Sequence, residues 1–323
     1  MIGVPYLDGG RLLALLTPGE ALRAVRRFFR EHDRAQVAAP PRIHLNVPGQ
    51  DNIGLYMPAA TRRFIGVKLA HLMPRRRPNV EAEVFLYEAA TGRLLYWGDG
   101  KPLTALRTAA VSAAGALAVL PRCRALAVFG SGVQAAAHIA AFAGAYPMLE
   151  DVRVRARSPA AGERLRALLP AGLAPLLRLE ESPRAALSGA DAIVTATPAP
   201  APLFDAAWLP ESCHIAAIGS AAPGMNELPP GAFTGARVWL DSPAALREAG
   251  DCLAAARAGW EPARVMGDQF DLIGGPAPAP GGRTLFKTVG HAAQDLALLI
   301  RVWELNGGAA ASGPAASAAP APR

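Results

Sequence analysis

The chain has 323 residues, of which 51% are hydrophobic and 18% are charged, so it can bury a large core and is not a mostly disordered protein. At roughly 100–200 residues per domain, this length predicts two domains. The formal net charge is +7, and all except three of the 33 basic residues are arginines. Because these arginines are scattered singly and in pairs, nucleic-acid binding rests on the net charge alone and is a weak hypothesis.

The cysteines and the apolar stretches exclude several classes of protein. Cys123, Cys213 and Cys252 lie far apart with no C-x-x-C spacing, so we expect neither a disulfide framework nor a zinc site. No basic segment followed by an apolar one opens the sequence, so no signal peptide is expected. The most apolar stretch, Thr108–Leu120, is shorter than the roughly 20 residues that span a bilayer. We therefore expect a cytoplasmic protein without a metal or a membrane segment.

The first part of the chain mixes predicted helices and strands. Pro18–Arg30 has the spacing of an amphipathic helix, with apolar side chains on one side. Lys101–Leu120 predicts a helix packed on all sides, because its Ala, Val and Leu positions leave little polar face. Short apolar runs bounded by turn residues predict four strands, at Arg42–Val47, Phe64–Leu69, Val84–Tyr87 and Leu94–Trp97.

The second part of the chain alternates short apolar runs with helical patterns. The runs predict buried strands at Ala125–Phe129, Val152–Arg155, Ala192–Thr195, His214–Ile218 and Val238–Leu240. Helices are predicted at Val133–Tyr146 and Pro159–Leu169, so the alternation favours a parallel sheet covered on both faces. Gly274–Gly282 predicts an irregular loop, Val289–Leu305 a closing amphipathic helix, and Gly307–Arg323 a disordered tail.

A glycine motif marks a candidate dinucleotide site. Residues 125–135 read ALAVFGSGVQA, which places G-x-G-x-x-A between a predicted strand and a predicted helix. In such a motif Gly130 allows the tight turn, Gly132 lets the backbone approach a pyrophosphate, and Ala135 lets the helix pack close to the strand. The unpaired N–H groups of the helix N-terminus then face the phosphates.

The end of the second predicted strand bears on the choice of cofactor. NAD sites commonly place Asp or Glu there for the ribose 2′-OH, but this strand ends in VRVRARSP with no carboxylate. The Arg157 guanidinium and the Ser158 hydroxyl could bind a 2′-phosphate, which favours NADP(H) over NAD(H). The alternative is that Arg157 is one more surface arginine. Thr195 and Thr197 follow a buried strand and are expected to contact the nicotinamide ribose, unless they form only a turn.

Three cations stand out in the first part of the chain. Arg42, Lys68 and Arg107 each interrupt an apolar stretch, where an unpaired charge would be costly. The neighbouring sequence supplies no anion for any of them. A substrate carboxylate would satisfy all three, and the alternatives are snorkelling side chains or internal salt bridges.

The chain resembles the ornithine cyclodeaminase/mu-crystallin family in four segments that occur in the family's order and spacing, namely KPLTALRTAAVSAAGAL, ALAVFGSGVQAAAHI, IGSAAPGMNELP and FKTVGHAAQDLA. The resemblance covers about residues 40–305. It implies an α/β fold in which a Rossmann domain, residues 119–290, is inserted in an α+β domain formed by residues 1–118 and 291–306. That α+β domain would bind the substrate and form a homodimer. The resemblance further implies carboxylate binding by Arg42, Lys68 and Arg107. The cofactor contacts that it implies are at Thr108, Gly130, Ser131, Gly132, Val133, Gln134 and Ser220.

One departure from the family pattern separates the activities that the family contains. Ala221 stands where the cyclodeaminases carry an Asp that holds the terminal amine of the substrate. Together with a second strand suited to NADP(H), this favours hydride transfer to a ketimine or 2-imino acid, or oxidation of the matching amino acid. Lys68 could also relay a proton if burial lowers its pKa. The alternatives are an ornithine cyclodeaminase, which makes L-proline and ammonia from L-ornithine, and a non-catalytic NADPH-binding protein.

Overall fold

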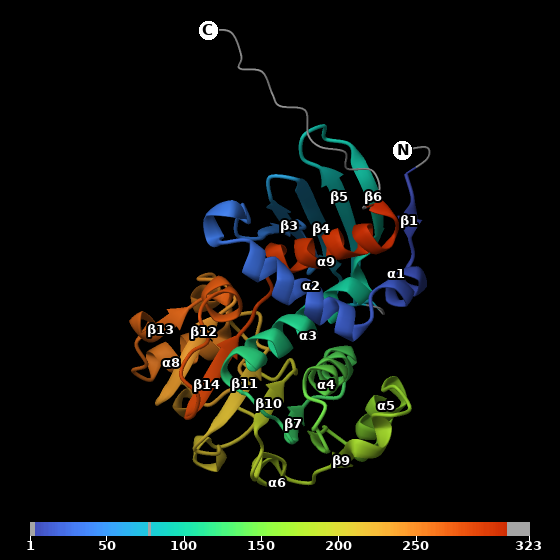
Figure 1. The fold of residues 1–323 in the computed structure, drawn as a ribbon. Coiled ribbons are helices and arrows are strands. Elements are labelled where there is room, and N and C mark those ends of the chain that lie inside the picture. The colour runs from blue at the N-terminus through green and yellow to red at the C-terminus, as the bar shows by residue number, and fades with distance from the viewer. Residues whose placement is uncertain (1–3, 77–78, 309–323) are drawn as a thin grey trace.

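Two sheets form the frame of the protein in the computed structural model, which describes residues 4–76 and 79–308 (Figure 1). The first sheet has six strands in the order β1-β6-β5-β4-β3-β2. Its strands are β1 (Tyr6–Leu7), β2 (Ile43–Asn46), β3 (Ile53–Ala60), β4 (Phe64–Leu72), β5 (Val80–Glu88) and β6 (Leu94–Asp99). Strands β2 to β6 form an antiparallel meander, and β1 pairs in parallel with β6.

The four strands predicted in this region are confirmed, but the sequence did not predict β3. Its Gly54 and Pro58 are residues typical of turns. Pro58 lies beyond Tyr56, the last residue of β3 that pairs with β2, so its missing N–H removes no hydrogen bond between these two strands.

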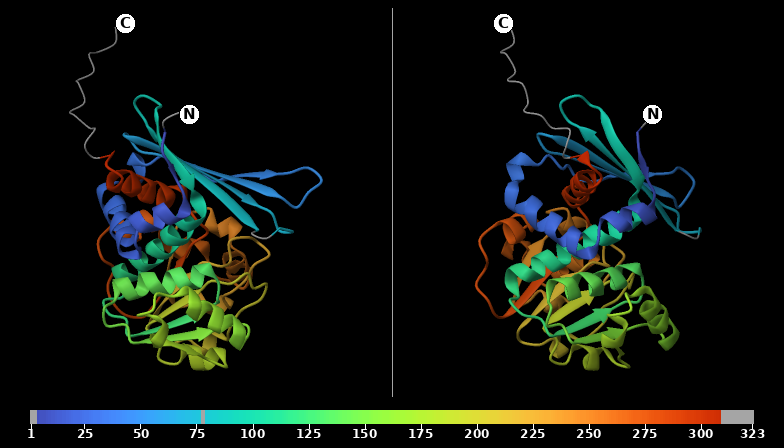
Figure 2. Two further views of the ribbon diagram at one scale, coloured as in Figure 1. Left: turned by 90° about the vertical axis from the view of Figure 1, so that its right-hand side faces the viewer. Right: turned by 45° about the vertical axis from the view of Figure 1, so that its right-hand side comes forward.

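Helices cover only one face of the six-stranded sheet (Figure 2). They are α1 (Gly9–Leu15), α2 (Pro18–Glu31), α3 (Gly100–Val119) and α9 (Ala292–Leu305). Helix α9 lies so close to β4 that a Cβ atom at Gly66 would meet Leu296 Cδ1 at 2.9 Å. Along β4 the buried positions, such as Gly66 and Lys68, alternate with partly exposed ones, such as Val67 and Leu69. Helix α9, the last helix of the described chain, thus packs against the six-stranded sheet formed by the start of the chain.

The second sheet has eight parallel strands in the order β13-β12-β14-β11-β10-β7-β8-β9. They are β7 (Ala125–Phe129), β8 (Asp151–Arg155), β9 (Leu177–Leu179), β10 (Ala192–Thr195), β11 (Cys213–Ala217), β12 (Ala236–Leu240), β13 (Val265–Gly267) and β14 (Arg283–Lys287). The α-helices of this part are α4 (Val133–Ala145), α5 (Pro159–Leu168), α6 (Pro183–Leu187), α7 (Ala245–Glu248) and α8 (Gly250–Arg257). The 3₁₀ helices of the protein are Arg34–Gln36, Ala174–Leu176, Ala206–Trp208, Pro230–Ala232 and Pro262–Arg264, and Phe270–Gly274 is a π-helix.

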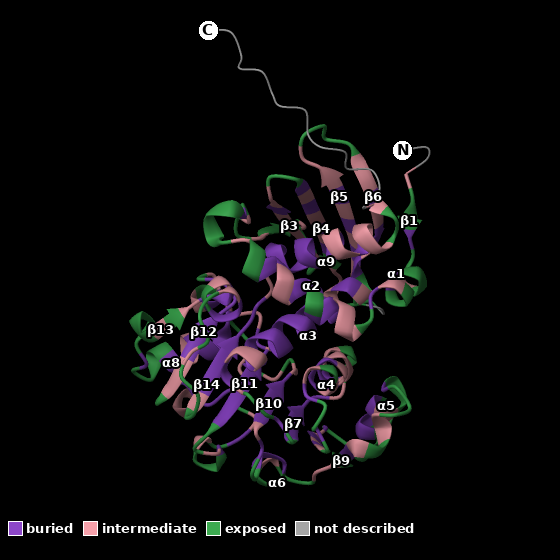
Figure 3. Ribbon diagram, viewed as in Figure 1, coloured by how far each residue is buried: buried purple, intermediate pink, exposed green. Residues whose placement is uncertain are grey.

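The continuous apolar runs of the central strands are buried, as predicted for a parallel sheet (Figure 3). The sequence did not predict β14, whose ends are the charged residues Arg283 and Lys287. The side chain of Lys287 is nevertheless fully buried, because it lies 3.3 Å from Asp251 Oδ2 and donates to Ala217 O at 3.2 Å. A charge that ends an apolar run thus need not lie at the surface.

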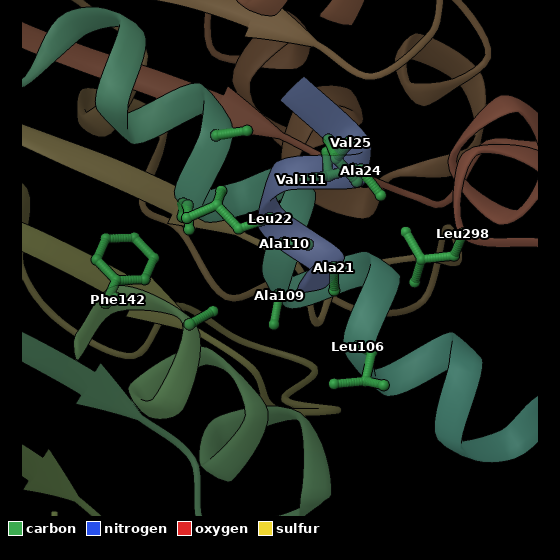
Figure 4. Packing of buried hydrophobic residues seen from close by; sticks show 14 of the residues in the cluster. Ala21, Leu22, Ala24, Val25, Leu106, Ala109, Ala110, Val111, Phe142 and Leu298 are labelled. Atoms are coloured by element: carbon green, nitrogen blue, oxygen red, sulfur yellow. The ribbon is translucent and has the colours of Figure 1, made fainter. Parts of the chain in front are cut away.

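Helix α3 joins the two sheets at the centre of the protein. Small residues, among them Ala109 and Ala110, lie where it crosses α2, and this lets the two helices approach closely (Figure 4). By length and composition alone α3 could cross a membrane, which the sequence analysis did not expect of any segment. However, 72% of its most apolar window is buried inside the protein, so the apolar surface of α3 is used in packing.

The closing helix begins later than predicted. Gly290 has a φ of 96°, and the His291 side chain accepts the Ala293 N–H, so α9 starts at Ala292 rather than at Val289. The irregular loop predicted at Gly274–Gly282 is confirmed, except that Gly274 still belongs to the π-helix. Most of the predicted disordered tail, residues 309–323, lies outside the described residues.

Candidate functional site

The turn between β7 and α4 has the backbone that the glycine motif predicts. Gly130 has a φ of 127°, and a Cβ atom there would lie 2.6 Å from Ala196 O, so no other residue fits without a backbone shift. Gly132 is the N-cap of α4 and offers no side chain to the first N–H groups of the helix. Those N–H groups and the positive end of the helix dipole are therefore available to an anion.

A cavity of about 800 Å³ opens at the carboxyl ends of β7, β8 and β10. Its volume is in the range of ligand pockets. Six of the predicted cofactor residues line it, namely Gly130, Ser131, Gly132, Arg157, Ser158 and Thr197. The other five, Thr108, Val133, Gln134, Thr195 and Ser220, do not. Of these five, Gln134 has a buried Oε1 atom with no hydrogen-bond partner in the described part of the chain, which is a polar atom that a ligand could satisfy.

Positive charge gathers at one side of this cavity. Arg155, Arg157 and Arg164 line it, and no Asp or Glu is among its described lining residues. Arg157 and Arg164 are exposed and form no ion pair or hydrogen bond within residues 4–76 and 79–308. The sequence analysis did not single out Arg164. In the structure Arg164 follows Ala161 by three helical positions, so the two residues lie on the same side of α5 and both line the cavity. The cavity is therefore suited to an anionic ligand.

Behind the cavity, the carboxylate of Glu227 holds two loops together. Its Oε1 accepts from Thr197 N at 2.6 Å and Thr197 Oγ1 at 2.9 Å. Its Oε2 accepts from Thr195 Oγ1 at 3.0 Å, Gly219 N at 2.7 Å and Ser220 N at 3.1 Å. Thr195 and Ser220, which were expected to contact the cofactor, are fully buried in this network. They hold the loops after β10 and β11 in place, and Thr197 alone of the three also lines the cavity.

We expect Glu227→Gln to lower the free energy of unfolding by about 2–4 kcal/mol. The glutamine NH₂ group would replace one of the two carboxylate oxygens, and the N–H and O–H groups that donate to that oxygen would lose their acceptor. Urea denaturation would measure the loss. Glu163→Gln, on the exposed surface of α5, is the control and should change stability by less than about 0.5 kcal/mol. An equally small change at Glu227 would contradict the role given to this carboxylate.

The three cations singled out by the sequence come together between the two sheets. Lys68 on β4 and Arg107 on α3 are both buried, and both contact Asp295 in the first turn of α9. Lys68 Nζ donates to Asp295 Oδ1 at 2.9 Å, and Arg107 Nε lies 3.2 Å from the same oxygen. Arg107 also donates to Gln294 Oε1 at 2.7 Å. Arg42 is close enough to Lys68 for its charge to act on the Lys68 ammonium group.

Arg42 has partners in the part of the chain that carries the second sheet. It forms an ion pair with Glu248 at the end of α7 and donates to Val289 O at 2.8 Å. All three cations therefore take part in internal salt bridges, the alternative that the sequence left open, and their carboxylates come from distant parts of the chain rather than from the neighbouring sequence. Glu248 lies more than 200 positions along the chain from Arg42, and Asp295 lies more than 200 positions from Lys68. Asp295 and Arg107 are 188 positions apart.

The paired cations still offer unused hydrogen-bond donors. The Nε atoms of Arg42 and Arg107 are buried, and neither has an acceptor in hydrogen-bond geometry among the described residues. A buried guanidinium N–H without an acceptor is costly, so a ligand oxygen at these atoms would be stabilising. Beside Arg42 and Glu248 lies a cavity of about 20 Å³, whose lining includes Met57, Gly290 and His291. This volume holds about one water molecule, so a larger ligand needs side chains to move.

Burial changes the protonation of the groups in this region. Burial lowers the pKa of Lys68 to about 8, and the charges of Arg107 and Arg42 act in the same direction, while Asp295 opposes them. Burial also lowers the pKa of His291, which the sequence analysis did not single out. Its Nδ1 accepts the Ala293 N–H at 3.3 Å, so the proton of the neutral ring is on Nε2. Lys68 can therefore exchange a proton near neutral pH, which an ordinary lysine does not do.

No group of three or more His, Cys, Asp or Glu side chains in the described part of the chain is arranged to hold a metal ion. The three cysteines are free and buried.

The Ornithine cyclodeaminase/mu-crystallin family model matches residues 13–308. The chain is 33% identical over 222 residues to the ketimine reductase mu-crystallin of Mus musculus, which covers 68% of this chain and 67% of that protein. It is 30% identical over 301 residues to the Delta(1)-pyrroline-2-carboxylate reductase 2 of Burkholderia ambifaria, covering 91% of this chain and 93% of that protein. Among solved structures, the iminosuccinate reductase of Paracoccus denitrificans in complex with NAD⁺ is 26% identical with a TM-score of 0.85, covering 95% of this chain and 97% of that one.

The family model spans strands β2 to β14, the glycine turn and all three cations, and the chain therefore belongs to the ornithine cyclodeaminase/mu-crystallin family.

Proposed function

We propose that the substrate of this NAD(P)-dependent imino-acid reductase is a ketimine or 2-imino acid with one carboxylate, and that NADPH is its preferred hydride donor. The observation that carries the proposal is the group of three cations, Arg42, Lys68 and Arg107, whose ion-pair partners among the described residues are Asp295 and Glu248. The Nε atoms of Arg42 and Arg107 have no acceptor among the described residues, and the two oxygens of one substrate carboxylate could accept from them. A second carboxylate would add negative charge to a region that already holds Asp295, Glu248 and the buried Asp241, whose charge acts on Arg107.

The order of the strands supports the placement of the two ligands. The 800 Å³ cavity lies over β7, β8 and β10, whereas Arg42 and Arg107 contact the Val289–Gly290 loop that follows β14. These strands are neighbours in the sheet through β11. A dinucleotide whose adenosine end lies near β8 would thus point its nicotinamide end toward the cations, in agreement with the general rule for open parallel sheets.

Reduction of a C=N bond needs a hydride at carbon, which the nicotinamide supplies when bound, and a proton at nitrogen. In our proposal Arg42 and Arg107 bind the carboxylate and so orient the C=N carbon. Lys68 supplies the proton to the imine nitrogen, directly or through a water molecule, since its lowered pKa lets it release a proton near neutral pH. The product is then the amino acid, with Lys68 left as a neutral amine until it takes up a proton from solvent.

Ala221 supports reduction rather than ring closure with release of ammonia. Its methyl group packs against the apolar cluster of the eight-stranded sheet and offers nothing to an ammonium group. One relative is a ketimine reductase, which supports a C=N substrate, and another is a Delta(1)-pyrroline-2-carboxylate reductase, which supports a cyclic imine.

A substrate panel tests this proposal. Oxidation of NADPH would be followed with Δ1-pyrroline-2-carboxylate, Δ1-piperideine-2-carboxylate and the dicarboxylate iminosuccinate, and release of ammonia would be followed with L-ornithine and NAD⁺. We expect turnover of the two cyclic monocarboxylates and a kcat/KM at least tenfold lower for iminosuccinate. Release of ammonia from L-ornithine without net change in the nicotinamide would instead establish a cyclodeaminase.

We further propose that two chains associate through the uncovered face of the six-stranded sheet. This face carries partly exposed apolar side chains on adjacent strands, among them Val67, Leu69, Phe85 and Trp97, and more exposed ones at the edges, including Ile43 at 56%. An apolar face of this extent is expected to be covered in solution, and a second copy covers it by symmetry. A mass of one chain in light scattering would contradict the proposal.

The Arg42–Glu248 ion pair leads to a further prediction. A substrate carboxylate has to compete with Glu248 for Arg42, because the adjoining cavity holds only about one water molecule. We expect Glu248→Gln to lower KM for the imino acid about tenfold, since a neutral amide is a weaker competitor, and to leave kcat within about threefold.

Steady-state kinetics would measure both constants. Glu304→Gln is the matched control, because the Glu304 side chain is 24% exposed, against 23% for Glu248, and also pairs with arginine. A higher KM in Glu248→Gln would show instead that Glu248 positions Arg42 for the substrate.

A further inference from the structure

Asp295 is a buried carboxylate that contacts both Lys68 and Arg107. Its side chain is 2% exposed, and both of its oxygens lie 2.9 Å from Lys68 Nζ. Arg107 Nε lies 3.2 Å from Oδ1, so one carboxylate contacts two of the three cations. Neither cation has another carboxylate within salt-bridge distance in the described residues.

The first turn of α9 holds Asp295 rigidly. His291 caps the helix, and Gln294, the residue before Asp295, accepts from Arg107 at 2.7 Å. Gln294 in turn donates to Gln269 Oε1 at 2.9 Å. The side-chain amide and the carboxylate of two successive residues therefore fix Arg107 from one helical turn, and the same carboxylate fixes Lys68.

The charges that face Lys68 come from three elements. Asp295 on α9 favours the ammonium form, whereas Arg107 on α3 and Arg42 before β2 disfavour it. Burial also disfavours the charged form. Among the main influences on Lys68 from the described residues, Asp295 is thus the negative charge that opposes the three that favour a neutral amine.

We propose that Asp295 is a positioning residue that keeps Lys68 in its ammonium form and holds Arg107 beside it, so that a proton donor and a carboxylate binder face one substrate. The reductase role of Lys68 rests on the function proposed above, but the effect of Asp295 on the charge of Lys68 does not. Without Asp295, Lys68 would lose its proton at a lower pH and could no longer donate one at neutral pH.

The protonation of Lys68 can be followed directly, because the chain has only three lysines. Protein labelled with ¹³C at lysine Cε should give three signals, which Lys101→Arg and Lys68→Met would assign. In the unaltered protein we expect the Lys68 signal to titrate near pH 8. In Asp295→Asn its midpoint should fall by about 1–3 pH units, since an opposing charge in contact has an effect of this size.

Kinetics should change in the same direction. Reduction needs the protonated lysine, so kcat/KM should decline above the pKa of Lys68. In Asp295→Asn that decline should begin at least one pH unit lower, with activity partly regained on lowering the pH. Asp295→Glu, which keeps the charge, should restore the position of the decline.

Asp251→Asn is the matched control, because Asp251 is equally buried and lies beside the buried Lys287. It should not move the Lys68 midpoint, whatever it does to stability. An unchanged midpoint in Asp295→Asn, or the same shift in Asp251→Asn, would overturn the proposal. If Asp295→Asn does not fold, a Lys68 midpoint below pH 7 in the unaltered protein would overturn it. If no imino acid is turned over, the proposed function fails while the lysine titration still decides the role of Asp295.

Discussion

Replacing Lys68 with methionine is expected to lower kcat/KM for imino-acid reduction by about 100–10,000-fold, the range of a lost general acid. Methionine keeps much of the length and flexibility of lysine but carries no proton and no charge. Arg107 would remain to pair with Asp295, so the carboxylate would not be left without a cation. The change should therefore act on chemistry more than on the fold, and kcat should fall more than KM rises.

The same assay with Lys101→Met provides the control. Lys101 lies at the start of α3, is partly exposed and pairs with Glu81, so its loss should leave kcat/KM within about threefold. Circular dichroism and thermal unfolding would show that both variants fold. Activity of Lys68→Met within threefold of the unaltered enzyme would exclude Lys68 as the proton donor.

Replacing Arg157 and Arg164 together with alanine is expected to raise KM for NADPH about 100-fold and to leave KM for NADH within about threefold. A charge-assisted hydrogen bond contributes about 1.5–3 kcal/mol, which corresponds to at least about tenfold for each arginine. Both guanidinium groups line the large cavity and have no ion-pair partner among the described residues. A 2′-phosphate would therefore gain their interaction without displacing a protein anion.

Titration of each cofactor by nicotinamide fluorescence would measure this preference apart from catalysis. The single variants would apportion the effect between the β8 end and α5. Arg257→Ala, on the exposed end of α8, should change neither cofactor. Unchanged NADPH binding in the double variant would refute the NADP(H) preference, and an equal loss for both cofactors would assign the arginines to the shared phosphates.

Local sequence was sufficient to predict a feature where the backbone conformation requires a particular type of residue. The turn at Gly130 needs a positive φ and close contact with Ala196, so its motif could be recognised from a few letters. The same holds for the buried parallel strands, whose apolar runs are continuous, and for α3, which has no polar face. By contrast, β3 was missed because Pro58 suggests a break, and its tolerance depends on where the neighbouring strand ends.

The sequence identified candidate residues but did not show which residues they contact. Thr195 and Ser220 were expected at the cofactor, yet Glu227 draws both into a network behind the cavity wall. Arg164 gave no signal, because an arginine on an exposed helix is ordinary in an arginine-rich chain. Its importance follows from the position of α5 beside the cavity.

The sequence by itself determined the dinucleotide turn, the parallel sheet and three cations in apolar surroundings. Each of these depends on a residue and its near neighbours, through backbone conformation or the cost of burying a charge. Only the tertiary structure decided how those charges are balanced. Asp295 and Glu248 reach the cations because α9 returns to the first sheet and α7 ends beside Arg42, and Coulomb interactions depend on distance in space rather than along the chain.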